Sequence, residues 1–347
     1  MTVVPISDPT TDHRSPPTVG EFTERELIAR IERHLPPSPA WMPVGIGDDA
    51  AVVEPERNRL QVLSVDALVE GVHFDRAFTP PAAIGHRALA VNLSDLAAMG
   101  AAPRLCLLSL VLPPAWPVDE FDQMIGGFTA LAARHRVHVA GGNLTRSPGP
   151  LLIDVTVLGG LKRRQALTRG GARPGDELYV TGSLGAAAAG LQMLKLSADA
   201  SGECARRYLF PEPRLRTGLL LGRNRAASAC IDLSDGLADG VHHIADGSGV
   251  GAIIDAEALP NEPAARAWFD AHAGDPITAA ITGGDDYELL FTVRPRTRGR
   301  LKAAAQNLDT PLTRIGVCTA DRAVVLRCGA GAQAGDRPIP AGYSHFR

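Results

Sequence analysis

Residues 45–50 read Gly45-Ile46-Gly47-Asp48-Asp49-Ala50, and similar combinations of glycine and aspartate recur at predicted strand ends along the chain. Two glycines let the backbone turn tightly and approach a ligand closely, where a Cβ atom would interfere. Two adjacent carboxylates supply hard oxygen ligands, which suit Mg²⁺ or Ca²⁺ better than soft metals. Because glycine and aspartate are also ordinary turn residues, the stretch indicates a binding site only together with its counterparts.

The spacing Gly45-x-Gly47-x-x-Ala50 also matches part of a dinucleotide-binding fingerprint. That fingerprint must follow a strand and open a helix. The residues after it, 51–53 and 60–65, predict a strand, a turn and a second strand instead. We therefore reject a dinucleotide site here and predict a hairpin.

The composition is that of an ordinary globular protein of about two domains. The chain has 347 residues, 45% hydrophobic and 21% charged, with a formal net charge of −3. This balance gives no reason to expect a nucleic-acid or membrane surface. The lysines are Lys162, Lys195 and Lys302, and none follows a glycine, which excludes a Walker A loop. Any bound phosphate must be held by arginine, backbone N–H groups and metal ions.

The cysteines are odd in number and scattered, which indicates reduced thiols in a cytosolic protein. They are Cys106, Cys204, Cys230, Cys318 and Cys328. No apolar run approaches the roughly 18 residues of a membrane span. The first residues are rich in Pro, Thr and Ser and lack an apolar signal core, so we expect a disordered tail over residues 1–19 and a cytoplasmic location.

The first half of the chain alternates helices and strands. Thr23-x-x-Glu26 is a capping box that opens a helix to about His34. Further helices are predicted over 81–99 and 118–134, and further strands over 104–112, 137–140 and 151–158. The strand beginning at residue 60 is expected to end on Asp66, and the strand over 137–140 to end in a loop at Gly141.

The second half repeats this alternation after an expected boundary near Gly159-Gly160. Strands are predicted over 177–180, up to 231, over 250–254 and over 288–293, and helices over 186–196, 236–243 and 263–271. Alternation in both halves predicts an α/β or α+β pair of domains.

Aspartates accumulate at the predicted strand ends and on the helix over 81–99. They are Asp48, Asp49, Asp66, Asp95, Asp232, Asp235, Asp285 and Asp286. Carboxylates gathered without lysine partners would repel one another, and they become favourable when Mg²⁺ bridges them to phosphate oxygens. We therefore expect them to converge around a phosphate-bearing ligand, as phosphoryl transfer requires.

Ordered motifs from Gly20 to the C-terminus give the chain a family resemblance. They are Gly45-Ile-Gly-Asp-Asp, Ser64-Val-Asp, His73-Phe, Asn92-Leu-Ser-Asp-Leu-Ala-Ala-Met-Gly, Gly141-Gly-Asn, Leu167-Thr-Arg-x-Gly, Ile231-Asp-Leu-Ser-Asp-Gly-Leu, Gly283-Gly-Asp-Asp-Tyr-Glu-Leu and Gly342-Tyr-Ser-His-Phe. With these motifs the chain resembles the thiamine-monophosphate kinases of the aminoimidazole-ribonucleotide-synthetase-like superfamily. The resemblance implies two domains, 20–160 and 161–347, each with a mixed sheet and packed helices.

The resemblance also implies an activity. ATP and several Mg²⁺ ions would serve a direct in-line transfer of the γ-phosphoryl group to thiamine monophosphate, giving thiamine diphosphate. The N-terminal domain would bind ATP and Mg²⁺ and pair into a homodimer, with ATP close to that interface. The C-terminal domain would complete the nucleotide and substrate site.

Site residues follow from the same resemblance, position by position. Asp48, Asp66, Asp95 and Asp232 would hold the catalytic metal ions, with Ser64, Asn143 and Asp235 as further ligands. Gly142, Asn143, Arg169 and Ser234 would contact ATP. His73, Asp285 and Tyr343 would face thiamine phosphate, although His73 and Tyr343 could equally serve loop and C-terminal packing. His242 and His243 are expected to be a surface pair.

Three positions depart from the family pattern. Asn143 stands where the family usually has Asp, Val65 where it has Thr, and Asp285 where it has Glu. These departures put the number of bound metals in doubt. Two alternatives stay open: another ATP-dependent enzyme of the superfamily, or a nucleotide-binding relative without catalysis.

Overall fold

The first sheet is mixed and has four strands, in a computed structural model that describes residues 16–196, 201–329 and 335–342. Its order is β1 (Arg59–Val69), β4 (Leu152–Lys162), β2 (Ala102–Leu112) and β3 (His138–Arg146). Neighbouring strands are antiparallel except β2 and β3, which are parallel. A parallel pair needs a crossover connection, and helix α3 (Val118–His135) supplies it.

Helix α2 (Pro81–Ala98) is the central element of the molecule. It packs against α3, against β1, β2 and β4 of the first sheet, and against α6 (Leu215–Asn224) and β6 (Ala229–Asp232) of the second half. A Cβ atom added at Gly85 would lie 1.9 Å from the Met124 carbonyl oxygen of α3. One added at Gly218 of α6 would lie 1.9 Å from the Ala97 oxygen, so glycine permits both close approaches.

The other face of the first sheet is only partly covered. Residues around Trp41, Met42 and Val53 pack on it against Leu105 and Leu158. Apolar side chains of β1 and β2 remain exposed there: Leu63 (64%), Val65 (56%) and Leu107 (42%). The predicted hairpin is wrong, because residues 51–53 form only an isolated bridge, Val52 to Val44, instead of pairing with β1. Strand β1 pairs with β4 over its whole length.

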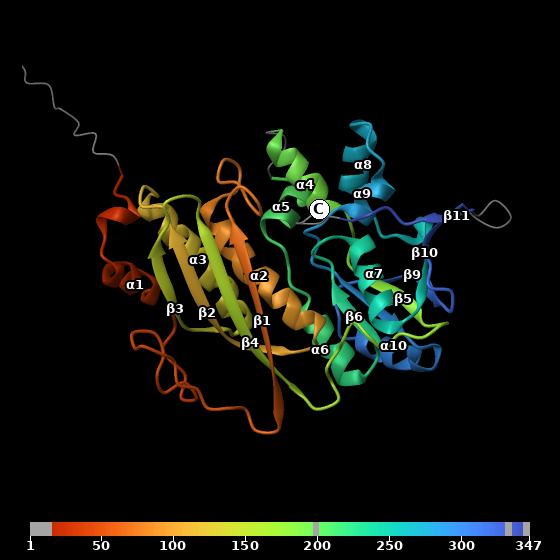
Figure 1. The fold of residues 1–347 in the computed structure, drawn as a ribbon, viewed down its shortest axis with the longest axis horizontal. Helices are drawn as coiled ribbons and strands as arrows, with labels where there is room; N and C mark the ends of the chain where they lie inside the picture. The colour runs from red at the N-terminus through yellow and green to blue at the C-terminus, as the bar shows by residue number, and fades with distance from the viewer. Residues whose placement is uncertain (1–15, 197–200, 330–334, 343–347) are drawn as a thin grey trace, which may run out of the picture.

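The second sheet is also mixed and has seven strands (Figure 1). Its order is β11 (Gly335–Pro338), β10 (Val324–Cys328), β7 (Gly251–Asp255), β9 (Leu312–Thr319), β5 (Glu177–Thr181), β8 (Leu289–Val293) and β6. Helix α7 (Leu237–Ser248) packs against β6, β7, β8 and β10. The predicted two-domain mixed architecture is thus confirmed.

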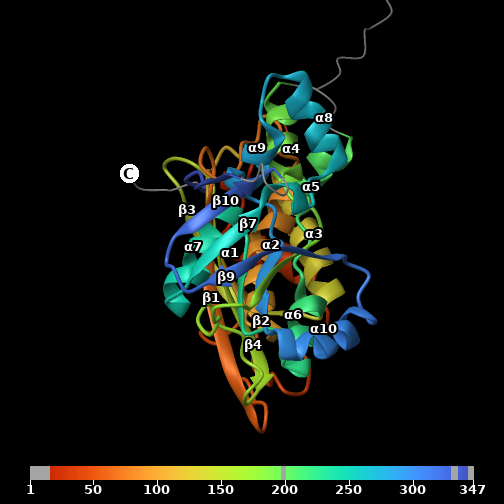
Figure 2. The same ribbon diagram turned by 90° about the vertical axis from the view of Figure 1, so that its right-hand side faces the viewer.

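Four further helices gather beside the second sheet, at the top of Figures 1 and 2. They are α4 (Ala186–Lys195), α5 (Glu203–Leu209), α8 (Pro263–Ala271) and α9 (Pro276–Thr282). Helix α10 (Arg298–Ala305) packs against α6. No element was predicted from the sequence for α5, α6, α9, α10, β9, β10 and β11. No described helix is long and apolar enough to cross a membrane.

The N-terminal segment enters the fold before residue 20. Val118 N–H donates to the Pro17 carbonyl oxygen at 2.9 Å, and Val19 is buried. The rest of the expected tail, residues 1–15, lies outside the described residues. The predicted capping box is confirmed, because Thr23 and Glu26 exchange hydrogen bonds at the start of α1 (Glu24–Glu32).

Candidate active site

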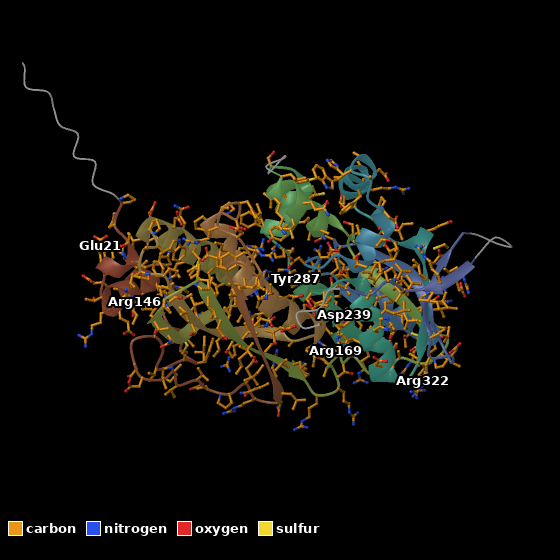
Figure 3. The ribbon with its side chains drawn as sticks, turned by 45° about the horizontal axis from the view of Figure 1, so that its top comes forward. Glu21, Arg146, Arg169, Asp239, Tyr287 and Arg322 are labelled. Atoms are coloured by element: carbon orange, nitrogen blue, oxygen red, sulfur yellow. The ribbon has the colours of Figure 1, made fainter. Side chains whose placement is uncertain are left out.

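A pocket of about 1140 Å³ lies between the two halves of the chain. Strand β1, the turn after it and helix α2 line one side. The end of β6, the start of α7, residues 282–285 with Tyr287, and α4 line the other. Figure 3 places Arg169, Asp239 and Tyr287, which all line this pocket, near the middle of the molecule. Many residues expected at the site are brought together here: Ser64, Asp66, His73, Asp95, Arg169, Asp232, Ser234, Asp235 and Asp285.

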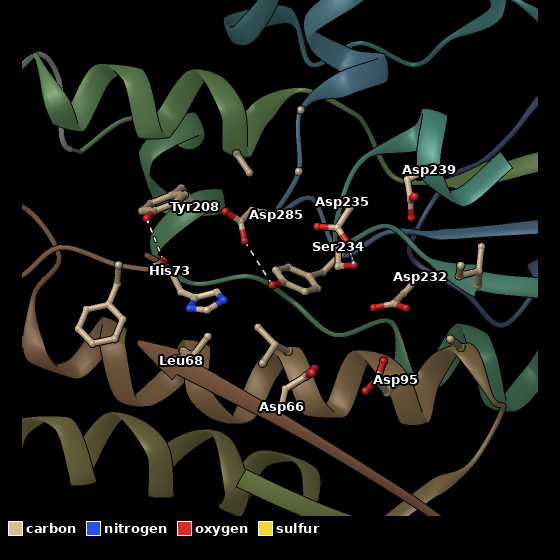
Figure 4. Close-up of a pocket in the computed structure, with 18 of the residues that line it drawn as sticks. Asp66, Leu68, His73, Asp95, Tyr208, Asp232, Ser234, Asp235, Asp239 and Asp285 are labelled. Carbon is tan, nitrogen blue, oxygen red and sulfur yellow. Dashed lines mark hydrogen bonds between the residues drawn. The ribbon is translucent and has the colours of Figure 1, made fainter. Parts of the chain in front are cut away.

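One end of the pocket is acidic (Figure 4). Asp66 comes from β1, Asp95 from α2 and Asp232 from the end of β6. Asp66 lies within β1 and not at its end, because the ladder with β4 continues to Val69. The three carboxylates line the same end of the pocket because α2 packs on both β1 and β6.

Neutral hydroxyl and amide groups fix this acidic end. Ser64 Oγ donates to Asp95 Oδ2, and Ser94 Oγ donates to Asp232 Oδ2 at 2.7 Å. Asn92 Oδ1 accepts from the Asp66 backbone N–H at 2.9 Å. Asn92 therefore ties α2 to the backbone of β1, and the Asp66 carboxylate remains available to a ligand.

Burial and mutual repulsion disfavour the ionised forms of these acids. Burial raises the pKa of Asp66 to about 7, with the charges of Asp95, Asp232 and Asp235 adding to the effect. Burial, then Asp95, raises the pKa of Asp232 to about 7. Burial also raises the pKa of Asp95, against the Ser64 hydrogen bond and the Arg169 charge. Such a cluster is suited to a cation that offsets its charge.

The donor set fits Mg²⁺ shared with phosphate oxygens. Within the described residues, no three His, Cys, Asp or Glu side chains stand close enough to hold an ion by themselves. Mg²⁺ commonly uses one or two carboxylates and completes its coordination with water and substrate phosphates. Carboxylates and a serine hydroxyl spread around an open pocket match that pattern.

The other end of the pocket is more aromatic and apolar. His73, Tyr208, Asp285 and Leu68 lie there (Figure 4). Phe78 and Leu191, which also line the pocket, pack in one apolar cluster with Tyr208. His73 Nδ1 accepts a hydrogen bond from the Val69 N–H at 3.0 Å. This acceptor role puts the proton of the neutral imidazole on Nε2.

Some expected site residues lie elsewhere. Asp48 is exposed in the loop before β1, and Gly142 and Asn143 lie within β3, which continues to Arg146 along β2 instead of ending at Gly141. None of the three lines the pocket. Gly142 has a packing role, since a Cβ atom there would lie 1.8 Å from the Leu108 oxygen. Tyr343 lies outside the described residues, but a Cβ at the preceding Gly342 would lie 3.1 Å from the Asp235 oxygen.

Asp286 was expected in the acidic cluster, but the structure places it elsewhere. Its buried carboxylate accepts hydrogen bonds from the N–H groups of Gly185 and Ala187, at 2.8 and 3.3 Å, and so caps helix α4. Burial raises its pKa to about 7. Asp49 is exposed beside Asp48.

Some residues in or behind the pocket wall were not predicted from the sequence. Ser94, which bonds to Asp232, belongs to the motif that begins at Asn92 but had no expected role. Tyr208 follows two arginines in a segment for which no helix was predicted. His242 and His243 are exposed, as expected, but His243 also lines the pocket, where its Nε2 lies 3.2 Å from Asp239 Oδ2. His243 follows Asp239 by four residues, a spacing that puts both side chains on one face of a helix. This spacing could have indicated from the sequence that the two residues lie together.

Comparison with known proteins shows the family to which this chain belongs. The family model for the AIR synthase related protein N-terminal domain matches residues 47–161, and that for the C-terminal domain matches residues 173–329. The thiamine-monophosphate kinase of Salmonella typhimurium is 41% identical over 87% of this chain and 91% of its own length. The thiamine-monophosphate kinase of Bacillus subtilis is 34% identical over 88% of this chain and 94% of its own length. The chain belongs to the thiamine-monophosphate kinase family.

Solved structures of this family share the fold. The thiamine-monophosphate kinase of Stenotrophomonas maltophilia K279a has a TM-score of 0.77 and 39% identity, over 90% of this chain and 98% of that one. A structure described as AaThiL complexed with AMPPCP and TMP has a TM-score of 0.71 and 32% identity, over 88% and 94%. The hydrogenase maturation protein HypE in complex with ATP, 18% identical with a TM-score of 0.76, shares the fold alone.

Proposed function

We propose that this protein transfers the γ-phosphoryl group of ATP to the phosphate of thiamine monophosphate and forms thiamine diphosphate. The observation that carries the proposal is one pocket with two unlike ends, an acidic end and an aromatic end. A triphosphate with its metal ions suits the first, and an organic cation with ring systems suits the second. Family membership agrees, since a relative is described in complex with AMPPCP, an ATP analogue, and TMP.

Asp66, Asp95 and Asp232, with Ser64 and Asp235, would hold Mg²⁺ together with phosphate oxygens. Bound Mg²⁺ supplies charge neutralisation, which both the carboxylates and the triphosphate need. Arg169 already acts electrostatically on Asp95 and Asp232, and we assign it and Ser234 to ATP. The proximity of acids and arginine supports this division of roles.

Direct transfer needs no nucleophile from the protein. The acceptor is a phosphate monoester, whose second pKa of about 6 leaves it anionic at neutral pH, so no general base is required. Cys230 at the pocket wall is buried, and burial raises the pKa of its thiol, which disfavours a thiolate. Catalysis then consists of positioning and charge neutralisation.

We assign His73, Asp285 and Tyr343 to thiamine monophosphate. Nε2–H of His73 suits a phosphate oxygen, and the Asp285 carboxylate suits a cationic or N–H-bearing ring. Tyr343 follows Gly342, which reaches the rim of the pocket beside Asp235 and Asp239. The positions of His73 and Asp285 at the aromatic end support the first two assignments. The assignment of Tyr343 rests on the family resemblance.

We further propose a homodimer that pairs through the open face of the first sheet. Exposed Leu63, Val65 and Leu107 form an apolar surface there, and such surfaces mark interaction sites. Strand β1 is also an edge strand, which can pair with a second chain. Asp48 and Asn143 are exposed in this domain and do not line the pocket, so we assign them to ATP or metal ions held close to the dimer interface.

The deciding experiment incubates the purified protein with ATP, Mg²⁺ and thiamine monophosphate and detects thiamine diphosphate by mass spectrometry. Asp95→Asn should lower the rate by about 100-fold or more, because it removes a charge from the acidic end. Asp119→Asn, an exposed acid at the start of α3, is the matched control and should keep full activity. ATP binding without product would favour a sister substrate or a non-catalytic relative.

We also propose a cytoplasmic location. Four of the five cysteines are buried and all five are free thiols, as a reducing compartment would keep them.

A further inference from the structure

Arg87 is a buried cation in an otherwise apolar stretch of α2, with a side chain that is 1% exposed. Its Nη1 donates to the Tyr208 carbonyl oxygen, and its Nη2 donates to Asp285 Oδ1 at 2.9 Å. Nη2 also lies 3.5 Å from the His73 carbonyl oxygen. The guanidinium carbon lies 4.3 Å from the centre of the Tyr208 ring. One guanidinium therefore contacts three residues that line the aromatic end of the pocket.

These partners come from three separate segments of the chain. His73 lies in the turn after β1, Tyr208 in α5 and Asp285 in the loop before β8. Tyr208 Oη in turn donates to the His73 carbonyl oxygen at 3.4 Å, as Figure 4 shows. Arg87 thus fixes a first-domain turn relative to two second-domain segments.

The Asp285 loop has a backbone that L residues rarely adopt. The φ angles are +67° at Asp285 and +48° at Tyr287. Backbone hydrogen bonds hold the loop, from Asp285 N–H to the Ser234 oxygen at 2.7 Å and from Tyr287 N–H to the Leu233 oxygen at 3.0 Å. Aspartate tolerates the left-handed region better than longer side chains. This gives a physical reason for Asp where the family resemblance led us to expect Glu.

The two oxygens of the Asp285 carboxylate are not equivalent. Oδ1 accepts from Arg87 and, at 3.2 Å, from Tyr287 Oη. Oδ2 accepts no hydrogen bond from the described residues, and the side chain is 30% exposed at the pocket wall. Arg87 and Tyr287 therefore fix one oxygen and leave the other for a ligand in the pocket.

We propose that Arg87 is a positioning residue for the thiamine end of the site. It acts through Asp285 and the His73 turn, aiming Oδ2 at the cationic or N–H-bearing part of the substrate. This inference rests on the proposed function. Arg87 and Asp95 are two turns apart on α2, a separation of about 12 Å along the helix, so Arg87 acts on the substrate end and not on the metal end.

Arg87→Lys tests this role. Lysine keeps the charge but lacks the planar fork that spans several acceptors. We expect the KM for thiamine monophosphate to rise about tenfold or more, with the KM for ATP and the Mg²⁺ dependence unchanged. In a variant that already carries Asp285→Asn, Arg87→Lys should raise the KM for thiamine monophosphate little further. The effects of substitutions at contacting residues that act together are not additive.

Arg214→Lys is the matched control. Arg214 is a half-buried arginine, 14% exposed, that pairs with buried Glu288 through Nε and Nη2, and neither residue lines the pocket. This substitution should lower the melting temperature without a selective change in the KM for thiamine monophosphate. A purely structural role of Arg87 would give the same result as this control and would overturn the proposal.

Tyr287→Phe removes only the second hydrogen bond to Asp285 Oδ1, so it tests the carboxylate's position if Arg87→Lys does not fold. It should also raise the KM for thiamine monophosphate selectively, and an unchanged KM would contradict the proposal. If the wild-type protein forms no thiamine diphosphate, the proposed function fails. In that case, isothermal titration calorimetry measures the Kd of thiamine monophosphate for the wild type and for Arg87→Lys. Weaker binding by Arg87→Lys supports the role of Arg87. Equal Kd values, or no binding by either protein, would overturn it.

Discussion

Ser94 Oγ donates a 2.7 Å hydrogen bond to Asp232 Oδ2 and so joins helix α2 to the end of strand β6 in the other domain. Both residues are buried. The bond partly offsets the rise in the pKa of Asp232, which burial causes first and Asp95 second. A neutral hydroxyl in α2 thereby helps to keep an acid of the second domain ionised.

Ser94→Ala should therefore weaken Mg²⁺ binding at the acidic end without removing a carboxylate. We expect a higher Mg²⁺ concentration at half-maximal activity and a loss of about 1 kcal/mol in the free energy of unfolding. Steady-state assays over a Mg²⁺ series and urea unfolding measure the two effects. Ser147→Ala is the control, because Ser147 is buried and bonds to the Pro150 oxygen outside the pocket. It should lose stability and keep its Mg²⁺ dependence.

The acidic cluster predicts a pH-dependent stabilisation by Mg²⁺. Asp66 and Asp232 have pKa values of about 7, above that of the unfolded chain, so the folded state holds extra protons below pH 7. Without metal, these two groups make the protein less stable as the pH rises through 7. Mg²⁺ prefers the ionised acids and must displace those protons at lower pH.

The difference in melting temperature between Mg²⁺ and EDTA should therefore increase from pH 6 to pH 8. Comparing the two conditions at each pH cancels the titration of groups remote from the metal, including His86, His135 and Asp286. Differential scanning fluorimetry measures both melting temperatures. In Asp66→Asn, the difference between Mg²⁺ and EDTA should increase less with pH. A difference independent of pH would contradict the prediction.

Asn143→Asp restores the carboxylate that the family usually has. It should lower the Mg²⁺ requirement or leave it unchanged, with little effect on stability because the residue is exposed on β3. Activity over a Mg²⁺ series is the measurement. A large loss of activity would show that the amide of Asn143 has a different role.

The open face of the first sheet predicts the oligomeric state. Val65→Glu should convert a dimer to a monomer in light scattering after size exclusion, because it places a charge in the exposed apolar surface. Leu196→Glu is the control, since Leu196 is also exposed, at 66% against 56% for Val65, but caps the end of α4 and belongs to no strand of the first sheet. A wild-type protein that is monomeric at micromolar concentration would exclude the dimer.

Local sequence signals determined much of the fold. The capping box at Thr23 and the long apolar stretch over 81–99 specify α1 and α2, because hydrogen-bonding caps and side-chain spacing act within a few residues. Glycine and aspartate at strand ends indicated the acids of the pocket, and motif order indicated the family. Segments 203–224 and 298–338 received no prediction, and long-range packing of the second half decides their structure.

Tertiary structure alone decided which of the singled-out residues meet. Asp66, Asp95 and Asp232 converge because α2 packs between β1 and β6, whereas Asp48 stays in an exposed loop on the first domain. Asp286 adjoins Asp285 in sequence, yet one caps α4 and the other reaches Arg87. A sequence specifies residue types and local conformation, but contacts between segments about 200 residues apart exist only after both domains have packed on α2.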